Sequence, residues 1–418
     1  MTAEYGAVTG CEVLDPAGWA ALGQGDSSLT LCGLFVSEPR VYACFEGPGG
    51  TRLVACELVE RAYPTLTAGF AAAGWFERLG FDLTGVRAIG GSDQRAAIRQ
   101  GAAGSDAAWP QFIETRGEGG YQIAAGPVAG MIATPVHRRF TMDRARVVSL
   151  EHRLGYTHRG IAGLMRGKSP RVAARFAARI AGDATVAHAT AFARSAEAAS
   201  GVAIPARARG LRTAMLAVER VTTDLVALGD AVERAGDVTY AGLLGRAREA
   251  IAMALGEVFG HRLMMDIVVP GGVALDARGE ALPRLYKALD GAVFTVRAFG
   301  WQRVRRDLAA AAPVAMARAR AVRAMAQAAR EGFSTLPEGP VALALPNATG
   351  MAVGVAESAR GKVHHWLDIG DGEIRDGFAI DPSARLLGVL EAAVVGLDFE
   401  AADVLMACYG LSTGAIDG

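Results

Sequence analysis

Short apolar runs with β-type composition dominate the first 60 residues of the chain. The runs SLTLCGLFV, RVYACFE and TRLVACELVE are separated by the turn-forming segments SEPR and GPGG. This pattern predicts strands joined by tight turns, with a hairpin turn rather than a phosphate-binding loop at Gly47–Gly50. Short helices and loops are expected from about residue 64 to residue 100.

The glycine-rich segment GAAGSDAAWPQFIETRGEGG, residues 101–120, predicts a domain boundary. We expect a small α/β domain at residues 1–105, a linker at 106–120 and a second domain at 121–418. The alternating segment that follows, YQIAAGPVAGMIATPVHRRFTMDRARVVSLEHRLG, predicts a small sheet with a turn near Met142 to Arg144.

From about residue 159 the apolar residues recur every three to four positions, which predicts long helices. One helix is expected to begin with Ser169 as N-cap and Pro170 at N1 and to end at Gly201, and a second to run from Pro205 to Gly236. Two more are expected at about 238–258 and 303–332, so the helices should form a bundle. From about residue 341 the tail predicts strands (VALALP, GVAESARGKVHHWLDI and EIRDGFAI), then a short helix and a last β-like run, ADVLMACYG.

The bulk composition limits the classes of function. Lys+Arg and Asp+Glu balance at 43 each, so no global field attracts nucleic acid or an anionic membrane. The five cysteines form no CxxC pair and are expected to be reduced thiols. Neither a secretory signal nor a transmembrane run is expected, so the chain should be cytoplasmic and reach a membrane only through a partner.

The densest polar cluster is SLEHRLGYTHRG, Ser149 to Gly160. It contains Glu151, His152, Arg153, Tyr156, His158 and Arg159. Such a cluster can relay protons, because histidine titrates near neutral pH and burial can raise the pKa of a glutamate. A buried structural network that holds two domains together explains the same residues, and both interpretations stay open.

The stretch RIAGDATVAH is expected inside the first bundle helix. A CxxC pair there would place two thiolates one turn apart, as a soft metal requires, but the positions hold Ala181 and Ala184. His188 is expected to be a core residue. Pro-Gly-Gly in VVPGGV predicts a turn, which is either a plain turn or one that closely approaches another element.

Two groups of arginines carry further expectations. Arg360, in the strand-like segment ESARG, should need an anion or a carboxylate partner. The arginines of the fourth helix are expected to be solvated; they are Arg318, Arg320, Arg323 and Arg330.

Taken in order, these segments resemble the large subunit of nickel–iron hydrogenases, most of all the energy-converting group four, and the homologous quinone-site subunit of respiratory complex I. The resemblance rests on GEGGYQIAAGPVAGMIATPVHRRF, EHRLGYTHRGIAGLMRGK, the segment that begins RIAGDATVAHATAFARS, GHRLMMDIVVPGGV, ESARGKVHHW and LMACYGLSTGAIDG. Upstream, YPTLTAGFAAAGWFERLGFDLTGVRAIGGSDQR is similar to the end of the adjoining small complex I subunit. The resemblance implies an α+β fold: a small α/β domain, then a long-helix bundle flanked by small β-sheets as in hydrogenase large subunits.

The chain departs from this family where the family binds nickel. The first cysteine pair of the family falls on Ala181 and Ala184, and the second falls on Ser412 and Ala415, while Cys408 lies outside the ligand register. The resemblance then implies that no nickel–iron centre is held and that the chain is not an active hydrogenase.

The quinone site is matched only in part. His137 falls where a family histidine lines the quinone chamber, whereas the family's quinone tyrosine falls on Phe176, which has no hydroxyl group. Three further family residues are replaced by Ala129, Thr134 and Asp224. The resemblance therefore implies a vestigial cavity, lined by His137, Phe176, Asp183 and Arg360.

The implied function is that of a non-nickel subunit in a hydrogenase-like or NADH–quinone oxidoreductase-like complex, peripheral to the inner membrane. It would dock an iron–sulfur small subunit and, through it, antiporter-like membrane subunits, with no metal or covalent cofactor of its own. Proton or quinone handling would fall to His137, Glu151, His158 and Arg159. One alternative is a true quinone-reducing subunit that takes electrons from NAD(P)H or a related donor. A free-standing assembly or regulatory factor is the other.

Overall fold

The computed structural model describes residues 7–91, 93, 96–98, 112, 119–127, 135–156, 158–298 and 309–412. These residues form two compact units. Unit 1 covers residue 7 and residues 164–377 and 397–411, and unit 2 covers residues 8–163 and 378–396 with residue 412. The predicted linker at 106–120 lies almost entirely outside the described residues, so the sequence-based boundary stays a prediction.

The first 60 residues form the main sheet of unit 2, as the apolar runs predict. Its strand order is β2-β5-β4-β3, and α2 (Ala73–Thr84) packs against β3. The strands are β2 (Glu12–Leu14), β3 (Thr30–Ser37), β4 (Arg40–Gly47) and β5 (Gly50–Glu57). Gly47 pairs with Gly50 at the end of the β4–β5 hairpin, which confirms the predicted turn. The sequence did not predict α1 (Pro16–Leu22), which the side chain of Asp15 caps, or the short strands β1 (Val8–Thr9), β6 (Ala62–Pro64) and β7 (Arg87–Ile89).

A second sheet in unit 2 confirms the strands expected after residue 120. It has the order β10-β9-β8, built from β8 (Gly120–Ala125), β9 (His137–Asp143) and β10 (Arg146–Arg153). The β9–β10 turn contains Arg144 at a φ of +52°, at the predicted position. The short helix expected in the tail is α11 (Pro382–Ala393), which packs on β10.

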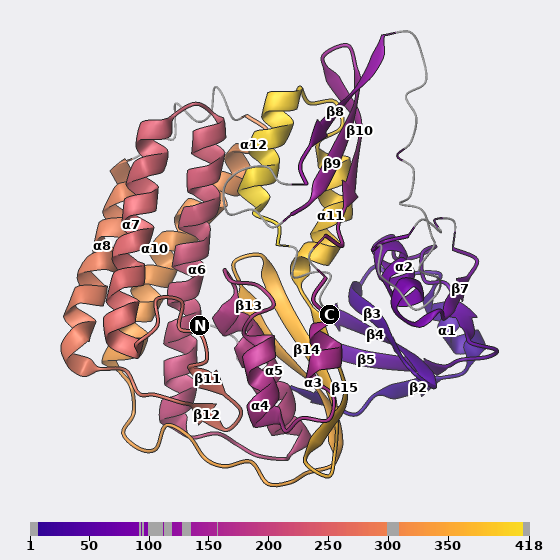
Figure 1. The fold of residues 1–418 in the computed structure, drawn as a ribbon, viewed down its shortest axis with the longest axis horizontal. Coiled ribbons are helices and arrows are strands. Elements are labelled where there is room, and N and C mark those ends of the chain that lie inside the picture. The colour runs from indigo at the N-terminus through magenta and orange to yellow at the C-terminus, as the bar shows by residue number, and fades with distance from the viewer. Residues whose placement is uncertain are drawn as a thin grey trace. The chain divides into compact units, whose positions relative to one another are not determined.

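The long helices of unit 1 form the predicted bundle (Figure 1). They are α6 (Ala206–Arg234), α7 (Val238–Phe259), α8 (Leu282–Ala298) and α10 (Ala312–Ser334). The sequence placed α6 and α7 correctly. It missed α8, and the start predicted for the fourth helix, residues 303–308, lies outside the described residues.

The prediction of one continuous helix from Ser169 to Gly201 was wrong, because two helices with a turn between them occupy this segment. The structure has α3 (Ile161–Met165), then α4 (Pro170–Ala177), a turn at residues 178–184, and α5 (Thr185–Ala199). Ser169 is the N-cap of α4 and Pro170 its first residue, as predicted. The helix breaks because Ala184 adopts a non-helical φ of −139° and the hydroxyl of Thr185 donates to the carbonyl of Ala178 at 2.9 Å.

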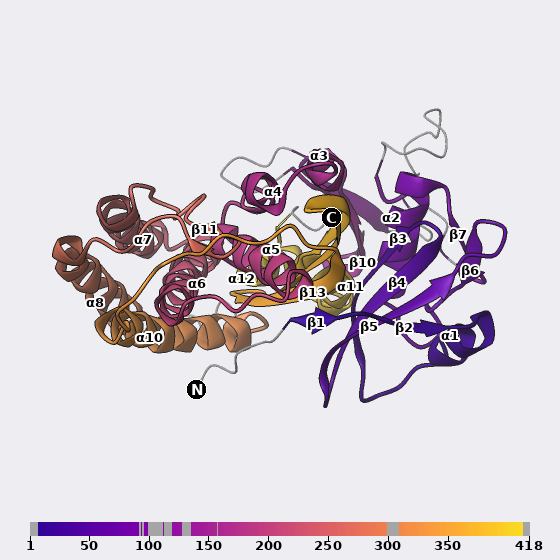
Figure 2. The same cartoon turned by 90° about the horizontal axis from the view of Figure 1, so that it is seen from below.

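A sheet with the consecutive strands β13 (Gly350–Ser358), β14 (Gly361–Gly370) and β15 (Glu373–Ile380) confirms the strands predicted in the tail. Helix α5 packs on it, over β13 and β14 (Figure 2). The approach is so close that a Cβ atom on Gly354 would lie 2.1 Å from the carbonyl oxygen of Ala191. Gly354 is therefore a packing requirement of this interface.

Two predictions for the tail were wrong. VALALP forms no strand, although Ala342 makes an isolated bridge to Gly272. The last β-like run is the helix α12 (Phe399–Tyr409), which the carboxylate of Asp398 caps at its N-terminus. A short apolar run fits a buried helix as well as a strand, and here the cap decides.

The Pro-Gly-Gly turn makes a close approach to another element, the one of the two expected possibilities that the structure bears out. It joins β11 (Val268–Val269) to β12 (Gly272–Val273), and the short 3₁₀ helix η1 (Gly279–Ala281) follows in the chain. A Cβ on Gly271 would lie 2.1 Å from the carbonyl oxygen of Leu343. The buried guanidinium of Arg212 holds the turn by donating to the carbonyls of Val269 and Gly272, at 2.7 and 2.8 Å.

Glu197 of α5 completes this network, because it pairs with Arg212 at 2.6 Å and accepts a hydrogen bond from the N–H of Gly271 at 2.8 Å. Both charges are almost fully buried, so each depends on the other.

Within the described part of the chain, no helix is both long and apolar enough to cross a membrane.

The buried pair yields a stability prediction. Arg212→Ala leaves the Glu197 carboxylate buried without its cation and should lower the free energy of unfolding by about 3–5 kcal/mol. Arg207→Ala is the matched control, because Arg207 pairs with Asp276 nearer the surface and its loss should cost about 1 kcal/mol or less. Urea denaturation of both variants measures this, and equal losses would contradict the assigned role.

Candidate functional site

The sheet β8–β10 carries His137 among positive charges. His137 pairs with Arg153 across the ladder, and Arg139 pairs with Glu151. Successive side chains of a strand point to opposite faces, so these four side chains lie on the same face of the sheet. The ring of Phe112 lies 4.8 Å from the His137 ring, and the Arg153 guanidinium lies 3.5 Å from the centre of the Phe112 ring. Burial, then Arg139 and Arg153, lower the pKa of His137, so its imidazole is mostly neutral at pH 7.

The rest of the polar cluster is spread over this strand and the segment after it. Glu151 is buried, His158 is half-buried and Arg159 is exposed. His152 has a structural contact, because its backbone N–H and its Nδ1 lie 3.2 and 3.0 Å from the carboxylate of Glu391 on α11. The structure thus brings His137 and Glu151 onto one sheet, and it places part of the cluster in a network that ties β10 to α11.

The turn between α4 and α5 in unit 1 contains RIAGDATVAH. Ala181 and Ala184 are both buried there, and the backbone carbonyl of Asp183 accepts a 2.6 Å hydrogen bond from the hydroxyl of Thr223 on α6. Phe176, near the end of α4, lies 6.0 Å from the ammonium group of Lys168. The turn is therefore fastened to α6 by its backbone.

Asp183 and Arg360 form an ion pair in the same unit. The two guanidinium nitrogens of Arg360 donate to the two carboxylate oxygens of Asp183, at 2.5 and 3.1 Å. The Arg360 side chain is 1% exposed and that of Asp183 is 40% exposed. Arg360 was expected on a strand, but the chain reverses there and Arg360 lies in the tight turn between β13 and β14. It also contacts the carbonyl of Gly410 at 3.4 Å. The carboxylate partner expected for Arg360 is thus Asp183.

A second buried pair corrects the interpretation of Arg318. This side chain was expected to be solvated, but it is buried and pairs with Asp224 of α6 at 2.5 Å. It also donates to the carbonyls of Cys408 and Tyr409 at 2.5 and 2.7 Å. Arg318 therefore neutralises Asp224 and caps the C-terminal end of α12, where cations are stabilising. No sequence period could show this, because the partners come from two other elements, α6 and α12, that are far from Arg318 in the sequence.

His188 is a core residue, as predicted. It is fully buried on α5, and its Nδ1 lies 3.0 Å from Nε2 of the equally buried His365 on β14. The Phe192 ring approaches His365 edge-on. No local sequence pattern indicates the role of His365, because its partner His188 lies across the helix–sheet interface.

The comparisons with known proteins agree with this architecture. The sequence model of the nickel-dependent hydrogenase family matches residues 159–228. Hydrogenase-4 component G of Escherichia coli (strain K12) is 28% identical over 290 residues, which cover 63% of this chain and 51% of that protein. A subunit of the NADH-quinone oxidoreductase of Clostridium beijerinckii is 26% identical over 152 residues, which cover 36% of this chain and 41% of that protein. The chain spans about half the length of the first of these relatives.

This chain is homologous to hydrogenase subunits and to one of the subunits of NADH-quinone oxidoreductases. It also has the fold of a hydrogenase large subunit. The Ni-Fe-Se hydrogenase of D. vulgaris Hildenborough superposes with a TM-score of 0.61 at 14% identity, covering 72% of this chain and 100% of that one.

The hydrogenase-like chain has no sulfur at the three described positions where the resemblance places nickel ligands. Ala181 and Ala184 lie in unit 1, and Ser412 lies in unit 2, where its N–H donates to the hydroxyl of Ser383 at 3.0 Å. The fourth position, Ala415, lies outside the described residues. Cys408 is buried on α12, and burial raises the pKa of its thiol to about 11, so it stays protonated at neutral pH.

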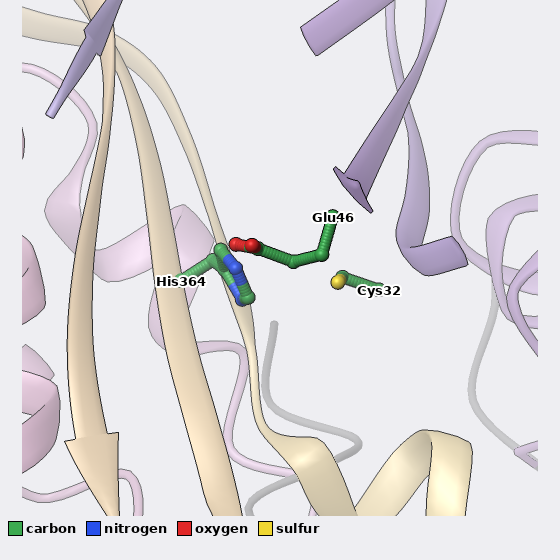
Figure 3. A group of neighbouring side chains, drawn as sticks. All are labelled: Cys32, Glu46 and His364. Carbon is green, nitrogen blue, oxygen red and sulfur yellow. The ribbon is translucent and has the colours of Figure 1, made fainter. Parts of the chain in front are cut away.

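Three further polar side chains belong to no pattern in the sequence. Cys32 and Glu46 lie on the neighbouring strands β3 and β4 of unit 2, and His364 lies on β14 of unit 1 (Figure 3). Glu46 accepts a 2.5 Å hydrogen bond from the hydroxyl of Thr51, and the Cys32 thiol lies 3.6 Å from the carbonyl of Thr30. One thiol and one carboxylate in unit 2 are fewer than the four ligands of a structural zinc site.

The environment of His137 yields a titration prediction. Arg153→Gln removes a neighbouring positive charge and should raise the pKa of His137, because protonation of the imidazole then meets less repulsion. NMR titration of the His137 Cε1–H signal measures this. Arg146→Gln, at the other end of the same strand, should leave the pKa unchanged. An unchanged pKa in both variants would show that the charge of Arg153 does not contribute to lowering it.

Proposed function

We propose that this chain is a non-nickel, hydrogenase-large-subunit-like component of a membrane-associated redox complex. Its relatives are named as a component of hydrogenase-4 and as a subunit of NADH-quinone oxidoreductase, so homologues of this fold work in multisubunit assemblies. By this proposal the chain docks an iron–sulfur small subunit, reaches the membrane through partner subunits, and contributes a scaffold rather than a hydrogen-activating centre.

The observation that carries the proposal is the chemistry of the α4–α5 turn. Nickel–iron chemistry requires soft thiolate ligands, and an alanine methyl group has no lone pair to donate. Ala181 and Ala184 occupy the two positions in this turn. A hydroxyl at Ser412 and a methyl group at Ala415 complete a donor set that does not fit nickel.

Asp183, one of the two residues between the alanines, supports the same conclusion. Asp183 places a carboxylate against the buried Arg360, so the chain itself supplies the anion that this guanidinium needs. A metal centre with thiolates would bring its own negative charges close to this turn. We infer that the ion pair stands in for that centre and keeps the fold of the turn without it.

A role in proton or quinone handling is the finer part of the proposal. His137, with its lowered pKa, can accept a proton at neutral pH, and Glu151 lies on the same face of the sheet. Phe176 supplies no hydroxyl to a quinone. The electron donor, NAD(P)H or a relative of it, and a quinone acceptor would belong to the complex rather than to this chain alone.

Nickel content tests the proposal directly. The chain should contain far less than one nickel per chain when it is expressed with a complete hydrogenase maturation system. An active nickel-containing hydrogenase large subunit, expressed in the same cells, is the positive control. Elemental analysis of the purified proteins gives the result. Near-stoichiometric nickel in this chain would overturn the donor-set argument.

The composition of the native complex tests the partner. Affinity purification of the full chain from its own cells should recover a protein with an iron–sulfur cluster, detected by iron and acid-labile sulfide and by electron paramagnetic resonance after reduction. Recovery of the chain alone under gentle conditions would instead favour the free-standing factor.

His137→Gln in an active complex should lower quinone-linked turnover about tenfold or more if His137 is a general acid–base group.

A further inference from the structure

Glu219 is a buried carboxylate in unit 1 that the proposed function does not use. It lies on α6 and is only 6% exposed. Its two oxygens point at the start of α5, where Oε1 accepts from the N–H of Val186 at 2.6 Å and Oε2 accepts from the N–H of Ala187 at 2.9 Å. These amides belong to the first turn of α5, whose N–H groups have no partner within the helix.

The cap that α5 receives from α6 replaces the cap that its own sequence lacks. The N-cap residue is Ala184, which has no side-chain oxygen to accept such a bond. An anion at a helix N-terminus is also stabilised by the helix dipole. The order of this first turn therefore depends on a carboxylate from another helix, and on both of its oxygens accepting.

A proton changes this geometry because it turns one acceptor into a donor. An ionised carboxylate accepts at both oxygens, whereas a protonated carboxyl group donates from one of them. We propose that Glu219 is a proton switch on the first turn of α5: ionised it holds both amides, and protonated it releases one of them and loosens the turn that carries Asp183.

The charges around Glu219 place the switch near physiological pH. Burial raises the pKa of Glu219 to about 8. The hydrogen bonds from the two backbone N–H groups and the charge of Arg360 act to lower this pKa, and the charge of Asp183 acts to raise it. Asp183, whose side chain is 40% exposed, lies close enough to Glu219 for its charge to raise the pKa of the buried carboxyl.

The other elements packed against α6 bring charged groups that already have partners. α10 contributes Arg318, which pairs with Asp224, and α12 contributes Asp403, which pairs with Arg234. At β12, Arg212 of α6 meets the carbonyl of Gly272. On α5 the nearest titratable residue after the turn is His188, whose ring is hydrogen-bonded to the ring of His365. Helix α7 approaches α6 at Gly229 through the side chain of Leu244.

The sign of the pH effect follows from the direction of the shift. The folded chain holds a proton on Glu219 up to about pH 8, whereas the carboxyl group in the unfolded chain loses it near 4.5. Folding therefore takes up a proton between these values, and the contribution of Glu219 to stability falls as the pH rises through about 8. Local protection of the two amides changes in the opposite sense, because the ionised form accepts from both.

The experiment is an NMR titration of the full chain labelled at Val186 and Ala187. The two amide signals should move with one common midpoint between about pH 6.5 and 9.5. Their hydrogen-exchange protection, corrected for the intrinsic base-catalysed rate, should rise about tenfold across that range. Glu219→Gln, which has one acceptor and one donor like the protonated acid, should abolish the titration.

Asp183→Asn is the second variant. It leaves the Glu219 side chain unchanged and should shift the common midpoint to lower pH, because it removes the negative charge that raises the pKa of Glu219. The two amides would overturn the proposal by showing no common midpoint in the natural chain, or by titrating unchanged in Glu219→Gln. If Glu219→Gln fails to fold, an unmoved or raised midpoint in Asp183→Asn decides against the proposal. None of these outcomes depends on nickel content or on a partner.

Discussion

The ion pair between Asp183 and Arg360 is the interaction on which the candidate site depends. A guanidinium group that is almost completely buried must have an anion, because an uncompensated charge in the interior is costly. In this chain the anion comes from the turn between α4 and α5. The pair therefore fixes that turn to the β13–β14 turn, and Arg360 extends the link to the carbonyl of Gly410 after α12.

Three other buried polar networks in unit 1 have the same logic, and each uses α6. Glu219 accepts the amides at the start of α5, and Asp224 holds Arg318 at the end of α12. Arg212 holds the Pro-Gly-Gly turn together with Glu197. In each case a side chain satisfies backbone groups that a helix end or a tight turn leaves without partners. Side chains of the long helix α6 thus hold the irregular segments around the turn in place.

The sequence predicted those features that depend on local pattern. The β4–β5 hairpin, the β9–β10 turn, α6 and α7 follow from periodicity and turn residues, and the need of Arg360 for an anion follows from its charge. The break before α5 was missed because its cap, Glu219, comes from another helix. The burial of Arg318 was missed for the same reason, because Asp224 and the end of α12 are far from it in sequence. The roles of His137 and Glu151 stay predictions, since proton or quinone chemistry depends on partners as well as on this chain.

A double-mutant cycle on Asp183 and Arg360 tests the central claim most directly. Asp183→Asn, Arg360→Gln and the combined variant are compared with the natural chain by urea denaturation at pH 7. If the pair is the internal substitute for a charged centre, the two changes should be strongly non-additive, with a coupling free energy of about 1–3 kcal/mol. Additive effects, with a coupling below about 0.5 kcal/mol, would contradict the account, because the two charges would then not depend on each other.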